Sequence, residues 1–174
     1  MNEGVHLVRA ELQEKIEYYV LSGDFTSVNA LMQSTEFMLF EEAFVSACHD
    51  SESVMYYTFI LECMKDAETV ELHDLAFLLL VYPLSEVNGA FNSAYYHAVR
   101  SMEMTDYKEV KSLLQLLFLY AVPEPVITDK EAFDTAKQIL KIDPKNQVAR
   151  NILKQAAKKL DKVVVDFNQI SKKA

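Results

Sequence analysis

The spacing of the apolar residues constrains this chain most, because they recur every three or four positions along nearly its whole length. Leu12, Ile16 and Val20, for example, fall on one face of a helix. Alternating runs typical of strands are hard to find. The 174 residues also include only 3 glycines and 4 prolines, too few for the turns of a many-stranded sandwich or barrel. The pattern therefore predicts an all-α protein whose helices are joined by short loops.

We expect about nine helices in antiparallel pairs, within a single domain covering residues 1–174. Gly23-Asp24 should end the first helix and His49-Asp50-Ser51 the third. Side chains that can accept a hydrogen bond from a helix N-terminus precede four later helices: Thr69 the fifth, Ser85 the sixth, Thr105 or Asp106 the seventh, and Thr128 or Asp129 the eighth.

Two helices stand out by their patterns. The fifth is apolar almost all round, from Leu72 to Leu80, so other helices must surround it. The last, from Gln147 to about Ile170, is long and amphipathic, which suits a C-terminal capping helix. Its apolar stripe consists of Ala149, Ile152, Leu153, Ala156, Leu160, Val163, Val164, Phe167 and Ile170.

Two recurrences near 38 residues indicate an internal repeat. Tyrosine pairs occur at 18–19, 56–57 and 95–96. A shift of 38 also places Ala94, Ala98, Met102 and Met104 on Ala132, Ala136, Leu140 and Ile142. Either shift spans one helix pair with its turns, and such a period is typical of a short α-solenoid.

The segment from Glu131 to Asn146, EAFDTAKQILKIDPKN, resembles the second helix and closing turn of a tetratricopeptide repeat. Ala149 and Leu153 look like the small and large apolar positions of the following helix, and Leu21–Phe25 resembles the turn within a helix pair. Lys154 departs from the pattern, since the family prefers Gly or Ala there. The resemblance implies a tetratricopeptide-like helical repeat and, more loosely, a peptide-binding groove.

A second resemblance rests on His73-Asp74-Leu75-Ala76 and on Tyr95-Tyr96-His97-Ala98. With these stretches in a small acidic helical-repeat chain, the sequence resembles immunity proteins of bacterial polymorphic toxin systems. This resemblance implies a bacterial protein that neutralises a toxin by binding it.

Charge is divided unevenly along the chain. The net charge of −9 is the sum of two unlike parts. An acidic body, residues 1–128, has 6 Lys/Arg and 20 Asp/Glu, whereas a basic end, residues 129–174, has 11 Lys/Arg and 6 Asp/Glu. A net of −14 on the body disfavours nucleic acid and membrane surfaces and suits a basic protein partner. We expect its partner-binding acidic surface to include Glu41, Glu42, Glu68, Glu71, Asp74, Glu103 and Asp106.

Residues that could carry chemistry are few. His73 and His97, with Tyr95 and Tyr96, form a possible polar site, but no histidine spacing typical of a metal site is present. Glycine-rich phosphate loops and nucleophile motifs are absent as well. We therefore expect no catalytic residue, no metal and no cofactor, and keep a metal-binding protein or enzyme using His73 and His97 as an alternative.

Cys48 and Cys63 lack the spacing of a redox or metal motif, and the longest apolar run is far too short to cross a bilayer. We expect reduced thiols in a cytoplasmic protein without membrane contact. The leading hypothesis is a protein–protein interaction module, most sharply an immunity protein. A tetratricopeptide-like adaptor that binds a peptide or helix in its groove is the alternative, and the sequence leaves the oligomeric state open.

Overall fold

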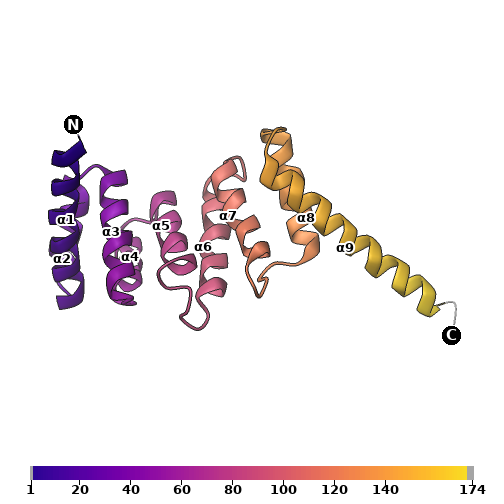
Figure 1. The fold of residues 1–174 in the computed structure, drawn as a ribbon, viewed down its shortest axis with the longest axis horizontal. Helices are drawn as coiled ribbons and strands as arrows, with labels where there is room; N and C mark the ends of the chain where they lie inside the picture. The colour runs from indigo at the N-terminus through magenta and orange to yellow at the C-terminus, as the bar shows by residue number, and fades with distance from the viewer. Residues whose placement is uncertain (1, 172–174) are drawn as a thin grey trace. The chain divides into compact units, whose positions relative to one another are not determined.

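The computed structural model describes residues 2–171, and the side chains of residues 8–162 (Figure 1). The described part is all-α and contains nine helices and no strand, as the apolar spacing predicted. The helices are α1 (Asn2–Ser22), α2 (Phe25–Ser34), α3 (Phe37–Ser51), α4 (Met55–Asp66), α5 (Val70–Val81), α6 (Ala90–Met104), α7 (Val110–Ala121), α8 (Asp129–Ile142) and α9 (Gln147–Ser171).

The chain forms two compact units, residues 1–97 and residues 98–174. The first contains α1 to α5 and the first half of α6, and the second contains the rest of α6 with α7 to α9. The expectation of a single domain remains a prediction. No helix of the described chain is long and apolar enough to span a membrane.

Aromatic side chains from α3 and α4 fill the core of the first unit. Phe44 contacts Phe40, Tyr56 and Phe59, with ring centroids 5.1–5.5 Å apart. All four rings are at most 1% exposed. Aromatic pairs in such geometry add about 0.5–1.5 kcal/mol beyond the burial of their area, so this cluster fixes α3 against α4.

Helix α5 is buried on nearly every side, as expected for a helix that is apolar all round. Its buried residues are Leu72, His73, Asp74, Leu75, Ala76, Phe77, Leu79 and Leu80. One expectation is corrected here: Asp74 is only 5% exposed, so it does not belong to an acidic surface. A carboxylate is ordinarily exposed, but the neighbours that cover α5 also cover Asp74.

Small residues let α8 and α9 pack closely in the second unit. Ala132 and Ala136 of α8, and Ala149 and Ala156 of α9, are all fully buried. The part of the predicted α9 stripe beyond residue 162, which includes Val163, Val164, Phe167 and Ile170, lies outside the described side chains.

Helix caps explain where the predicted boundaries agree with the structure. Thr69 accepts a hydrogen bond from the backbone N–H of Leu72, and Thr128 accepts one from Glu131 in a complete capping box. Both caps were predicted. Asp24 likewise caps α2 by accepting a hydrogen bond from the N–H of Ser27.

The predicted end of the third helix at residues 49–51 is confirmed, since α3 ends at Ser51 and Glu52 adopts a left-handed φ of 50°. Two other predicted boundaries are wrong. Ser85 does not cap the sixth helix, since turns continue to Gly89, whose φ is 84°, and α6 begins only at Ala90. The turn at residues 105–107 includes two left-handed residues, Asp106 and Tyr107, and delays α7 to Val110.

Only one of the two recurrences near 38 residues relates equivalent positions in the structure. The tyrosine pairs occupy unlike positions, near the end of α1, near the start of α4 and in the middle of α6, so they do not mark equivalent sites. The shift of α6 onto α8 does match in burial: Ala94 and Ala98, like Ala132 and Ala136, are fully buried. At the other end of these helices, Met104 and Ile142 are both exposed.

Candidate functional site

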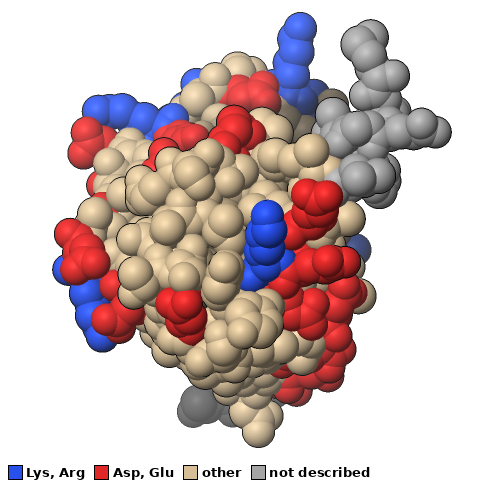
Figure 2. All heavy atoms as spheres, turned by 90° about the vertical axis from the view of Figure 1, so that its left-hand side faces the viewer, with Lys and Arg blue, Asp and Glu red and all other residues tan. Residues whose placement is uncertain are grey.

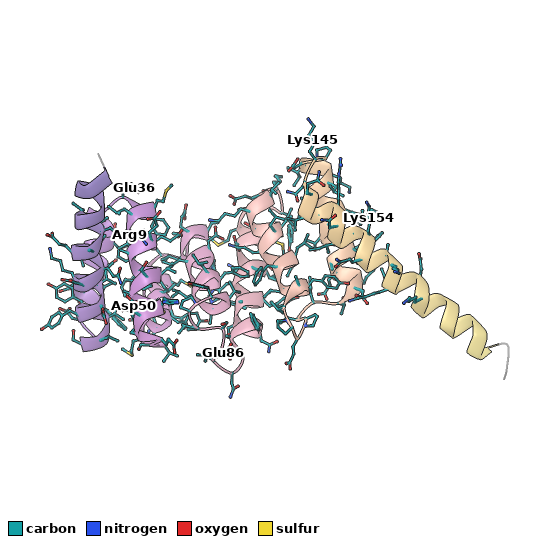
Figure 3. All side chains as sticks on the ribbon, viewed as in Figure 1. Arg9, Glu36, Asp50, Glu86, Lys145 and Lys154 are labelled. Carbon is teal, nitrogen blue, oxygen red and sulfur yellow. The ribbon has the colours of Figure 1, made fainter. Side chains whose placement is uncertain are left out.

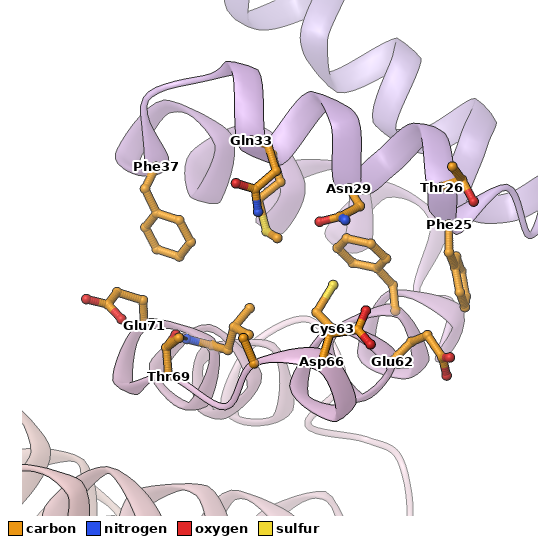
Figure 4. Close-up of a pocket in the computed structure, with 14 residues that line it drawn as sticks. Phe25, Thr26, Asn29, Gln33, Phe37, Glu62, Cys63, Asp66, Thr69 and Glu71 are labelled. Atoms are coloured by element: carbon orange, nitrogen blue, oxygen red, sulfur yellow. Dashed lines mark hydrogen bonds between the residues drawn. The ribbon is translucent and has the colours of Figure 1, made fainter.

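A groove opens in the first unit between α2 on one side and α4 with the start of α5 on the other (Figure 4). Its volume is about 690 Å³, within the usual range for ligand sites. In this unit α1 packs mainly against α3, while α2 and α4 meet at the Phe25–Phe59 contact without packing extensively along their lengths. No local motif marks this groove, because it depends on how two helices that are distant in the sequence are placed.

The groove has an apolar floor and a polar rim. Phe59 and Leu72 are buried at its base, and Phe25, Met32 and Phe37 are half-buried along its α2 side. Phe25 and Phe59 are in edge contact, with centroids 5.6 Å apart. The polar side chains of α2 that line it are Thr26, Asn29 and Gln33.

Three carboxylates line the groove from the α4 and α5 side. Glu62 and Asp66 belong to α4, and Glu71 belongs to the first turn of α5; all three are exposed. Glu62 is already paired with Lys65. The lining includes no lysine, arginine or histidine, so the rim is acidic.

Cys63 also faces the groove (Figure 4). Burial, with smaller contributions from nearby Asp66 and Glu62, raises the pKa of its thiol to about 11. Cys48 is fully buried in the core, and burial raises its pKa to about 12. Both cysteines are free.

The two histidines singled out in the sequence do meet, and they form a buried relay of hydrogen bonds. His73 Nδ1 lies 2.8 Å from His97 Nδ1, His73 Nε2 lies 2.9 Å from Glu68 Oε1, and His97 Nε2 lies 2.9 Å from the Tyr57 hydroxyl. Both imidazoles are fully buried. The relay thus links α4, the α4–α5 loop, α5 and α6 within residues 1–97.

Only one arrangement of protons satisfies the relay when both imidazoles are neutral. The Glu68 carboxylate can only accept, so His73 Nε2 donates to it and His73 Nδ1 is left as an acceptor. His97 Nδ1 then donates to His73, and the Tyr57 hydroxyl donates to His97 Nε2. Every ring nitrogen is therefore engaged.

Protonation of His97 is unfavourable. Burial, reinforced by the proximity of His73, lowers the pKa of His97 to about 4. Burial likewise raises the pKa of Tyr57, so its hydroxyl stays protonated at neutral pH. Among the described residues, no group of three or more His, Cys, Asp or Glu side chains is placed to hold a metal ion.

The distance between the two histidines is that of a hydrogen bond. Two nitrogens bound to one tetrahedral zinc at about 2.0–2.1 Å would be about 3.3 Å apart, farther than the 2.8 Å observed. The geometry therefore supports a structural link between α5 and α6. The other half of the predicted polar site flanks it: the Tyr96 ring contacts His73 and His97, and Tyr95 is half-buried on the same helix.

The predicted acidic residues are dispersed over the two units. Glu42 pairs with Arg9 at 3.2 Å, Glu68 holds His73, and half-buried Glu41 is next to Glu42 on α3. Glu103 and Asp106 belong to the second unit, where they pair with Arg100 and Lys108. Of the seven, Glu71 alone lines the groove.

The carboxylates of the first unit still dominate its charge. Residues 1–97 contain 16 Asp/Glu and only 3 Lys/Arg, of which Arg9 and Lys65 are in ion pairs. Acidic side chains form a band down one side of the face seen in Figure 2. In the second unit, residues such as Lys145 and Lys154 reverse the balance, with 14 Lys/Arg against 10 Asp/Glu (Figure 3).

Comparisons with known proteins found no match for this chain. No family model matches the sequence, no curated protein is significantly similar to it, and no solved structure matches its fold.

Proposed function

We propose that the protein is an interaction module that binds a basic protein partner through its acidic first unit. The observation that carries this proposal is the charge of residues 1–97, a net of −13. Such an excess accelerates the approach of a basic partner and repels acidic ones.

The sharpest form of the proposal is an immunity protein that neutralises a basic toxin. The short stretches around His73 and His97 suggested this form, and both now contribute to one buried relay. The relay links α4, α5 and α6 to one another within the acidic first unit. The partner of such a protein would be basic, as nucleases that bind phosphate backbones are.

Co-expression with the products of neighbouring genes tests this form directly. A complex should be captured at 0.1 M NaCl and weaken strongly at 0.5 M, where the Debye length shortens to roughly 4 Å. The variant Glu86→Lys changes the charge of the first unit at an exposed loop residue and serves as a general charge control (Figure 3). The immunity form fails if no neighbouring product binds at either salt concentration.

An adaptor that binds a peptide or helix is the second candidate, and the groove between α2 and α4 favours it. The shared burial pattern of α6 and α8 supports the tetratricopeptide-like repeat that this candidate implies. Binding would then be concentrated in the groove and insensitive to charge changes elsewhere on the first unit.

A further inference from the structure

The groove differs from the rest of the acidic surface because it joins carboxylates to an apolar floor. Phe37 and Glu71 lie at one end of it, and Phe25 and Glu62 lie at the other (Figure 4). An apolar side chain entering between these ends would lose water against Phe25 and Leu72. Burying a large apolar side chain in this way is worth about 1.5–3 kcal/mol.

The position of Asp66 is not explained by helix stability. Asp66 is the last residue of α4, where the helix dipole disfavours negative charge by about 0.3–1 kcal/mol. Glu71, in contrast, is in the first turn of α5, where the dipole favours it. Neither forms an ion pair within the described chain, so both carboxylates are available at the groove.

Charge complementarity identifies the occupant. Because no basic side chain lines the groove, Asp66 and Glu71 would attract Lys or Arg on either side of a buried anchor. The exposed amides of Asn29 and Gln33 on the α2 side can hydrogen-bond to the backbone of a bound segment.

We propose that this groove binds a short peptide segment of a basic protein, in which an aromatic or large aliphatic anchor is flanked by Lys or Arg. The inference rests on the proposed function and deepens it by assigning the contact to one place. The anchor would fill the floor between Phe25, Phe59 and Leu72, and the flanking cations would face Asp66 and Glu71.

The test uses the full chain and a library of random 12-residue peptides displayed on phage. Selected peptides should contain an aromatic or large aliphatic residue with Lys or Arg on both sides. A synthetic peptide of the selected consensus is then measured by fluorescence anisotropy at 50 mM and 300 mM NaCl. Its Kd should rise with salt, and replacing the anchor by Ser should weaken binding about tenfold or more.

Two variants with the same change of charge distinguish binding in the groove from electrostatic attraction by the first unit as a whole. Asp66→Lys should weaken the consensus peptide at least about tenfold, because it reverses a charge beside the bound cation. Glu86→Lys, in the loop after α5, should change the Kd by no more than about threefold (Figure 3). A thermal melt followed by circular dichroism checks that Asp66→Lys stays folded, as the helix dipole predicts.

Selection of acidic peptides, absence of a consensus, or equal weakening by Asp66→Lys and Glu86→Lys would overturn the groove assignment. If Asp66→Lys leaves the affinity for a captured protein partner unchanged, the proposed function survives and the groove assignment falls. If basic peptides bind as expected but no neighbouring gene product does, the groove assignment stands and the immunity form falls.

Discussion

At the scale of single residues, the hydrogen bonds of the histidine pair explain how two ionisable side chains can be fully buried. Histidine is ordinarily half-charged near pH 6.5, yet His97 is buried where charge is costly. Engaging all four ring nitrogens satisfies the polar atoms of both rings while His97 stays neutral. The relay is therefore sensitive to acid.

We expect the free energy of unfolding to fall as the pH falls from about 6.5 to 4. His97 has a pKa of about 4 when folded, against an ordinary value of 6.5, so the unfolded chain binds more protons across this interval. The loss attributable to His97 is on the order of 3 kcal/mol. Urea unfolding at pH 7, 5.5 and 4.5 measures it.

His97→Gln removes this titration and should flatten the dependence on pH, although it lowers stability at neutral pH. The matched control is His49→Gln, since His49 is exposed at the end of α3 and outside the relay. Equal slopes for wild type and His97→Gln would contradict the assignment.

At the scale of helices, α8 offers the most direct test of the capping argument. Thr128→Ala should lower the free energy of unfolding by about 1 kcal/mol, because it leaves the backbone N–H of Glu131 without its partner. Thr128→Ser keeps the hydroxyl and should retain most of the stability. Chemical denaturation of the three proteins measures the difference, and an Ala variant as stable as wild type would refute it.

The helices that could be predicted are those whose signals are local. Thr69 and Thr128 were assigned correctly because a cap acts within three residues of its own position. Ser85 was assigned wrongly as the cap of α6, because the helix begins after Gly89, which has a left-handed conformation. The burial of Asp74 and the presence of the groove depend on which helices pack against one another. The residue pattern within a single helix does not determine that packing.

At the scale of the whole molecule, charge opposes folding in the first unit. We expect the thermal midpoint to rise between 20 mM and 0.5 M NaCl, because salt screens the repulsion among its carboxylates. For a chain of this length, each kcal/mol of relieved repulsion corresponds to about 2–4 °C. Differential scanning calorimetry measures the midpoint.

Glu86→Lys reduces the same repulsion by substitution and should therefore melt higher at low salt and gain less from added NaCl. A midpoint that falls with salt would mean that ion pairs such as Arg9 with Glu42 outweigh the repulsion.

Because Cys63 faces the groove while Cys48 is enclosed in the core, the native chain has one thiol at its candidate site and none competing at the surface of the described structure. Small electrophiles could be tethered there without any engineering, so the groove is open to covalent fragment screening. The high pKa of Cys63 makes such coupling slow at neutral pH, which favours molecules that first reside in the groove. The same cysteine would allow a covalent ligand to be attached within the groove.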